Sequence, residues 1–450
     1  MRRVPGSIQL VALVLALYVF LYNPIFIAIG IGSIKILLLA CLAYAAFNPK
    51  VVLLLRRFRN EAFFTVCLII YAAFAAARSP DTVSHEAYLH AVWFLESIVI
   101  PITLVHGFRR VLARYDWEMV IVLTGSVAAV ITLVLISMPD WNQFVRTRLI
   151  AQSLDPEEWW FRGFAIAEGA SFSYGIIQGL VVGICLWCVK RSKLYALPVL
   201  PLLISILFNA RTGLVVVLIS MLLLLASRRV SLRLVWMLTL TVSAGIAVDR
   251  AVGFTERNAG TIGWVTSAFN DTKRLVSGDR SSDTYSQLFG EMLVVPSTLG
   301  GVLLGERASP GAAAIQQVSD IGYVNELFFG GTLYIGILLG CLAYMYARVR
   351  RRSGHCYYPL LFVATLLLAN VKWVSLFVPS GFFRLFCLFY VYTLLSQKRR
   401  LAVTPGSGSV VGELVAPRSR QRARSGGRHG HRVHAAFADS PGLCPASAQP

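Results

Sequence analysis

The chain has 450 residues, of which 56% are hydrophobic, and a formal net charge of +20. Its mean hydropathy of +0.67 excludes an ordinary soluble enzyme. The excess Lys and Arg residues lie in short connectors between apolar blocks and in the C-terminal region. Membrane topology and anionic lipid head groups therefore explain the positive charge better than nucleic-acid binding does.

The apolar blocks are each roughly 20 residues long, which is the length that an α-helix needs to cross a bilayer. We expect about twelve transmembrane spans on this basis. They lie at residues 8–24, 28–47, 62–77, 88–106, 118–138, 169–189, 194–209, 212–227, 233–249, 328–347, 357–371 and 382–396. The first block follows Met1, Arg2 and Arg3 and has no clean cleavage site after it, so we expect it to be retained as a span. The predicted fold class is an all-α, polytopic integral membrane protein.

The basic connectors fall between every second pair of blocks, and Lys and Arg concentrate on the cytoplasmic side of short loops. This pattern predicts cytoplasmic N- and C-termini and two long outward segments, 139–168 and 250–327. The larger segment is too rich in aromatic and apolar residues for a solvated linker, so we expect it to be folded. Residues 1–396 form the predicted transmembrane domain, and 397–450 read as a basic, disordered cytoplasmic tail.

The outward face carries arginines that the charge rule does not explain. Arg211 lies in a tight turn, Phe208 to Gly213, between two predicted spans, and Arg162 and Arg280 belong to the two long outward segments. A guanidinium at membrane depth is costly unless it meets water, a carboxylate or an anionic ligand. Its planar fork suits phosphate oxygens, although a snorkelling or salt-bridged structural arginine is the alternative.

Carboxylates lie near two predicted span starts on the same face. Glu168 is a candidate general base, and its alternative role is to complement the helix dipole. Asp320 and Tyr323 share a helix face, as do Tyr323 and Glu326, because these pairs are three residues apart. Asp320 is likewise a candidate base, and its alternative role is an N-cap.

Two charged residues inside predicted spans, Lys35 and Glu96, are unusual, and we expect either a buried pair or pore-lining groups. Cys185 and Cys188 have CxxC spacing but lie in an apolar run without a second pair, which does not support a redox or zinc site. The sequence also lacks an HExxH motif, a His cluster, a Walker loop and a dinucleotide fingerprint. We therefore expect no metal, no cofactor and no direct use of ATP.

Several short motifs resemble one known family. Asn209-Ala-Arg-Thr-Gly-Leu resembles the Ser-Arg-Thr-Gly-Leu start of a span in bacterial O-antigen polymerases and ligases. Arg162-Gly-Phe before Glu168-Gly-Ala-Ser is also typical of that family. Leu303-Leu-Gly-Glu, followed by Ser319-Asp-Ile-Gly-Tyr-Val-Asn-Glu, resembles the close of its large periplasmic loop. Together with the topology, the likeness to the O-antigen polymerase–ligase superfamily covers about residues 8–396.

The resemblance implies an inner-membrane glycosyltransferase that uses undecaprenyl-diphosphate-linked oligosaccharides at the periplasmic face, without a metal or a nucleotide sugar. A chain-length regulator as partner is carried over from the family alone. The implied site residues are Arg211, Arg280 and Arg162 for the diphosphate, Asp320 or Glu168 for catalysis, and Tyr323, Glu326 and Thr212 for substrate binding.

One departure from the family pattern bears on which member it resembles. Ligases commonly carry a His where Asp320 stands, three residues before Tyr323. This departure favours a polymerase of the Wzy type and leaves the identity of the base open. An O-antigen ligase, a lipid-linked oligosaccharide flippase or other transporter, and a non-catalytic scaffold remain as alternatives.

Overall fold

The computed structural model describes residues 5–77, 85–150, 163–168, 172–227, 263, 293–306, 321–372, 374 and 376–402. Within these ranges every regular element is a helix, apart from two isolated β-bridges between Ile25 and Gly32 and between Phe26 and Ile150. The predicted all-α class is thereby confirmed for the described residues. The chain divides into two units, Met1–Arg400 and Leu401–Pro450, and the helical bundle belongs to the first of them.

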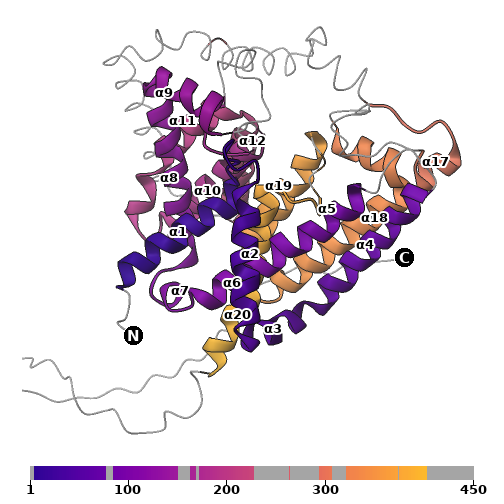
Figure 1. Cartoon of the computed structure of the whole chain (residues 1–450), viewed down its shortest axis with the longest axis horizontal. Coiled ribbons are helices and arrows are strands. Elements are labelled where there is room, and N and C mark those ends of the chain that lie inside the picture. The colour runs from indigo at the N-terminus through magenta and orange to yellow at the C-terminus, as the bar shows by residue number, and fades with distance from the viewer. Residues whose placement is uncertain are drawn as a thin grey trace, which may run out of the picture. The chain divides into compact units, whose positions relative to one another are not determined.

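The helices follow the predicted apolar blocks in order (Figure 1). They are α1 Gly6–Tyr22, α2 Ser33–Ala46, α3 Pro49–Leu55, α4 Arg59–Ala77, α5 His85–Phe94, α6 Ile100–Gly107, α7 Val111–Arg114, α8 Trp117–Ser137, α9 Pro139–Phe144, α10 Phe172–Cys188, α11 Val199–Asn209, α12 Thr212–Ala226, α17 Leu299–Leu304, α18 Gly322–Arg350, α19 Tyr357–Lys372 and α20 Gly381–Ala402. Two 3-10 turns, η1 Arg56–Phe58 and η4 Lys193–Ala196, and two π-helical turns, η2 Leu95–Val99 and η3 Val145–Leu149, complete the described elements.

Four helical stretches among the described residues are long and apolar enough to cross a membrane: Pro49–Ala75, Ala87–Gly107, Trp117–Ser137 and Gly322–Arg350. The other apolar helices have 10–17 residues. The length and apolar character of the four long stretches fit a membrane-embedded helical protein. The total of twelve spans and the orientation remain predictions, and the predicted span 233–249 lies outside the described residues.

Two stretches differ from the predicted boundaries. The basic connector before the predicted span 62–77 is helical, since α3, η1 and α4 run on from Pro49, and proline at the first helical position favours such a start. α18 begins at Gly322, so Tyr323 and Glu326 lie in its first turns and not before it. The backbone of Gly331, with φ of 69°, then interrupts α18.

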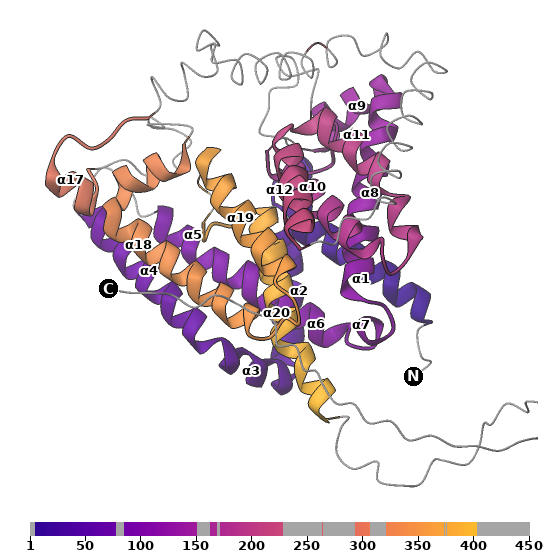
Figure 2. The same ribbon diagram turned by 180° about the vertical axis from the view of Figure 1, so that it is seen from behind.

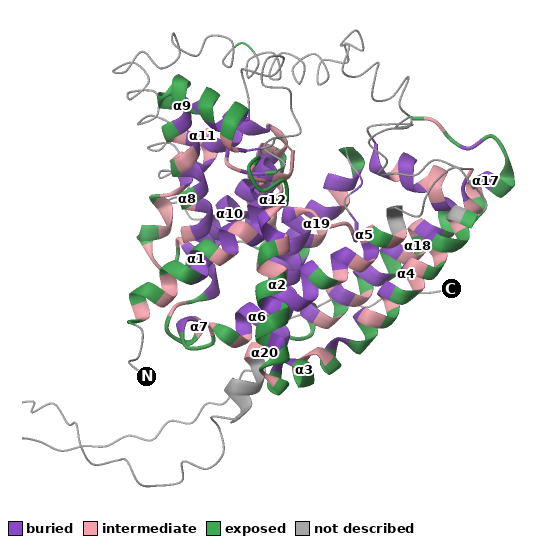
Figure 3. Cartoon of the chain, in the orientation of Figure 1, coloured by how far each residue is buried: buried purple, intermediate pink, exposed green. Residues whose placement is uncertain are grey.

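The surfaces of the long helices are those of a lipid-facing assembly. α4 and α18 lie side by side (Figures 1 and 2), and the ring centroids of Phe64 and Tyr344 are 5.1 Å apart. Elsewhere on the surface of α4, Phe63 and Ile70 are 64% and 63% exposed. Figure 3 shows exposed residues along this edge, whereas α10 is buried almost throughout. Apolar side chains exposed along a whole helix face suit contact with acyl chains.

The helix α10 lies at the centre of the packing and touches α8, α11, α12 and α19. Its glycines Gly175, Gly179 and Gly183 lie one turn apart on one face. A Cβ built on Gly175 would lie 2.5 Å from the Ala210 carbonyl oxygen, and one on Gly179 would lie 2.5 Å from that of Gly213. The backbones of α10 and α12 therefore touch, as in the small-residue crossings of membrane helices.

The short helix α17 packs against the break in α18. The Glu306 backbone N–H donates to the Phe328 carbonyl at 2.7 Å, and the Tyr71 hydroxyl donates to that of Gly330 at 2.6 Å. The Glu306 carboxylate accepts hydrogen bonds from the Thr298 hydroxyl at 2.7 Å and from the Thr298 backbone N–H at 2.8 Å. These bonds, with those from Ser297, lower the pKa of Glu306. The ionised carboxylate thereby ties the end of α17 back to the residues before its start.

Candidate functional site

The first turns of α10 collect the segments that carry the described candidate residues. The ring of Tyr174 lies 5.3 Å from that of Tyr22 at the end of α1, and the ring of Phe172 lies 6.1 Å from that of Phe382 at the start of α20. The α11–α12 turn packs on Gly175 of the same helix. The segments that end or begin α1, α11, α12 and α20 therefore meet around one half of α10.

Arg211 is the N-cap residue of α12 and is half-buried, as is Thr212. A buried polar network holds Asn209, two residues before Arg211, in place. The Asn209 amide donates to the Ser205 carbonyl at 2.9 Å, and the Tyr174 hydroxyl lies 2.8 Å from both the Ser205 and Thr132 hydroxyls. Because Asn209 is fully buried, this network fixes the backbone from which Arg211 projects.

Glu168 is held by a clamp that the sequence did not reveal. Asn23 is 4% exposed and adopts the left-handed conformation, with φ of 41°. Its side-chain oxygen accepts the Ile34 N–H at 2.9 Å, and its amide nitrogen donates to the Glu168 carboxylate. The Glu168 N–H donates to the Tyr22 carbonyl at 3.0 Å. Glu168 itself is exposed, so a solvent-accessible carboxylate is fixed from the buried side.

Replacing Asn23 by aspartate is expected to open this clamp. Aspartate tolerates the left-handed conformation but removes the donor and sets a second negative charge against Glu168. We expect the free energy of unfolding to fall by about 1–3 kcal/mol, seen as a lower thermal midpoint of the purified protein in detergent. Asn48→Asp is the control, because Asn48 is the N-cap residue of α3, where aspartate is equally favourable. Equal thermal midpoints for the two variants would show that the contact between Asn23 and Glu168 does not stabilise the protein.

An ionic triad around a buried carboxylate joins α2, η2 and α20. Glu96 is fully buried near the middle of the apolar stretch Ala87–Gly107. The Lys35 ammonium lies 2.6 Å from one of its carboxylate oxygens, and the Arg384 guanidinium lies 2.7 Å from the other. Lys35 and Glu96 therefore form an ion pair, with Arg384 as a second cation, although the Lys35 side chain is 38% exposed. The π-helical turn around Glu96 is of a kind that is frequent at functional sites.

A second buried ion pair lies elsewhere in the bundle, between α4 and α18. Glu61 is 1% exposed and pairs with Arg348, and the Tyr390 hydroxyl donates to the same carboxylate oxygen. The Arg348 guanidinium also donates to the Arg57 carbonyl at 2.8 Å. Arg348 belongs to a run of basic residues that indicates membrane topology in the sequence, but in the structure its guanidinium pairs with the buried carboxylate of Glu61.

Tyr323 and Glu326 connect α18 to α19. The Tyr323 hydroxyl donates to the Leu367 carbonyl at 3.1 Å, and the Asn370 amide donates to the Glu326 carboxylate at 2.9 Å. Glu326 is fully buried. These contacts support a packing role for both residues against α19.

Three predicted site residues, Arg162, Arg280 and Asp320, lie outside the described residues. In the part of the chain that the structure describes, no three His, Cys, Asp or Glu side chains are grouped so as to hold a metal ion. The described candidate site therefore consists of Glu168 with its clamp, the Arg211 turn and the neighbouring helix starts.

Comparison of the chain with protein-family models, with curated proteins and with solved structures found no match to any of them. The likeness to O-antigen polymerases and ligases accordingly rests on the motifs and the pattern of apolar blocks.

Proposed function

We propose that this chain is a bacterial inner-membrane glycosyltransferase that polymerises undecaprenyl-diphosphate-linked oligosaccharide repeat units at the periplasmic face. The observation that carries the proposal is the backbone contact between α10 and the Arg211 turn. Glu168 lies four residues before α10, whose Gly175 packs against Ala210. The turn that carries the candidate phosphate-binding cation thus packs on the helix that follows the candidate base in the chain.

In the proposed reaction, the acceptor hydroxyl oxygen attacks the anomeric carbon of the donor glycan. The bond from that carbon to the diphosphate breaks, and the diphosphate leaves with its electron pair. Arg211, together with Arg162 or Arg280, stabilises the negative charge as it develops. Glu168 or Asp320 takes the proton of the acceptor hydroxyl. A single displacement of this kind inverts the anomeric centre.

The test replaces Arg211 by alanine and by lysine in cells that make the polymer, with the protein level checked. We expect Arg211→Ala to lower polymer formation at least about 100-fold, as the loss of a transition-state donor does, and single repeat units to accumulate on the carrier lipid. Lysine keeps the charge without the bidentate fork, so an intermediate loss is expected. Arg148→Ala is the control, since Arg148 is an exposed arginine of the predicted outward segment.

Other outcomes would point elsewhere. Full-length polymer with Arg211→Ala would reject the proposed role of Arg211. Repeat units trapped on the cytoplasmic leaflet would indicate a transporter, and long chains left on the carrier would indicate a ligase.

The transporter alternative is favoured by one observation. Glu96 and Arg384 of the Lys35–Glu96–Arg384 triad are buried within apolar helices, and ionisable groups in such positions often mark transport pathways. The experiment in polymer-producing cells distinguishes the two functions, because a transport defect leaves the lipid-linked repeat units on the cytoplasmic leaflet.

A further inference from the structure

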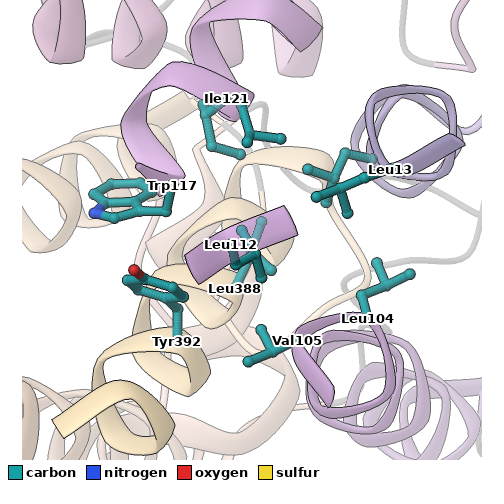
Figure 4. Close-up of a pocket in the computed structure, with 10 residues that line it drawn as sticks. Leu13, Leu104, Val105, Leu112, Trp117, Ile121, Leu388 and Tyr392 are labelled. Carbon is teal, nitrogen blue, oxygen red and sulfur yellow. The ribbon is translucent and has the colours of Figure 1, made fainter. Parts of the chain in front are cut away.

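The described part of the chain contains an apolar pocket that no candidate site residue reaches (Figure 4). It lies among α1, α6, α7, α8 and α20 and has about 330 Å³ of unfilled space, its open part included. Figure 4 shows Leu112 of α7 directed into it, with Trp117 and Tyr392 along one side. All of its walls are hydrocarbon or aromatic surface, which suits an acyl chain and offers a sugar or a diphosphate no hydrogen-bond partner.

The helices on either side of the connector that supplies Leu112 place this connector at a membrane surface. It joins Ala87–Gly107 to Trp117–Ser137, two stretches that are each long and apolar enough to cross a bilayer. A short connector between two such helices must lie where hydrocarbon gives way to head groups. The pocket beneath it therefore opens at the depth where a phospholipid places the upper part of its acyl chains.

The same connector is basic on its exposed side. Arg109, Arg110 and Arg114 are all exposed, whereas Val111 is buried and Leu112 is half-buried. Asp116 is the acidic residue of the connector 108–116, which leaves an excess of positive charge beside the pocket. Lys and Arg side chains at a membrane surface attract anionic lipid head groups.

We propose that the pocket and the α7 connector together bind an anionic phospholipid of the surrounding bilayer. An acyl chain occupies the pocket and contacts Leu112, and the lipid phosphate is held by Arg110 and Arg114. Hydrocarbon walls suit the acyl chain of a lipid, and the adjacent guanidinium groups suit its phosphate. A soluble ligand would not match both features. The site is independent of the proposed glycosyl transfer.

The test uses the purified full-length chain in detergent with phosphatidylglycerol and phosphatidylcholine of identical acyl chains as probes. Native mass spectrometry counts retained lipids, and thermal unfolding measures stabilisation. We expect phosphatidylglycerol to be retained and to raise the midpoint more than phosphatidylcholine does. The double variant Arg110→Gln/Arg114→Gln should weaken phosphatidylglycerol binding at least about tenfold, and Leu112→Trp should lower retention of both lipids by filling the pocket.

Arg350→Gln/Arg351→Gln is the matched control, because it removes two exposed arginines at the C-terminal end of α18. It should leave phosphatidylglycerol binding unchanged. Equal retention of the two lipids by the unmodified chain, or an equal loss in both double variants, would overturn the proposal in favour of diffuse charge attraction. If Leu112→Trp does not fold, Val105→Phe fills the same pocket from α6, and undiminished lipid retention in that variant would also overturn it.

Discussion

Replacing Glu96 by glutamine is expected to destabilise the protein by about 3–5 kcal/mol, because it leaves the buried Arg384 guanidinium without a counter-charge. Arg384 is 3% exposed on its side chain and cannot turn to water. Its other contacts are backbone carbonyls, that of Pro379 at 2.8 Å and that of Phe20 at 3.4 Å, which cannot replace a full negative charge. The thermal midpoint in detergent and the yield of monodisperse protein measure the effect.

Glu118→Gln is the control for this charge removal. Glu118 pairs with Arg191 at 3.3 Å, but the Arg191 side chain is 54% exposed and can be hydrated instead, so we expect at most about 1 kcal/mol. The double variant Glu96→Gln/Arg384→Gln should recover part of the loss, since it removes one of the unpaired charges together with its partner. A Glu96→Gln protein as stable as the unmodified chain would show that the triad contributes nothing to stability.

Replacing Gly179 by alanine is the second large expected effect. The new methyl group would lie 2.5 Å from the Gly213 carbonyl oxygen and 2.9 Å from Cβ of Val216. Neither neighbour is the end of a flexible side chain, so α10 and α12 must move apart. Overpacking of this kind costs about 1–3 kcal/mol or more, and the shift would displace the Arg211 turn. The thermal midpoint should fall, and polymer formation should fall with it at temperatures where the protein remains folded.

Gly336→Ala tests whether the location of the methyl group decides the result. Gly336 lies in α18, and a Cβ there meets nothing within 4 Å. Alanine favours a helix over glycine by about 0.5–1 kcal/mol, so this variant should be as stable as the unmodified chain or slightly more so. If Gly179→Ala behaved in the same way, α10 and α12 would not be in backbone contact in the membrane.

The helices themselves were largely predictable because hydrophobic length is a strong signal. Blocks of roughly 20 apolar residues gave α8 and α10 to within a few residues. Lys35 and Glu96 stood out in the sequence for a related reason, since a charge in an apolar span needs a partner or a polar pathway, but the sequence did not name their partners. Arg384 carries the same signal, because it too lies inside a predicted apolar block, 382–396.

Other parts of the site carried no readable signal. Asn23 in the sequence reads only as a turn residue, and its contact with Glu168 joins residues 145 positions apart. The packing role of Glu326 depends on Asn370, which lies in a different helix. The spacing of Gly175, Gly179 and Gly183 was a usable clue that pointed to close helix packing, although it does not name α12 as the partner. Single-chain periodicity gives faces and lengths, whereas pairings over such distances need coordinates.

The break at Gly331 has a consequence for the order of assembly. The carbonyls of Phe328 and Gly330, on the N-terminal side of the break, accept hydrogen bonds from Glu306 and Tyr71. Both donors precede Phe328 in the chain and therefore leave the ribosome first. When the interrupted helix enters the membrane, the donors to the carbonyls of Phe328 and Gly330 are already synthesised. These two carbonyls can therefore be hydrogen-bonded in the hydrocarbon region before any later segment is made.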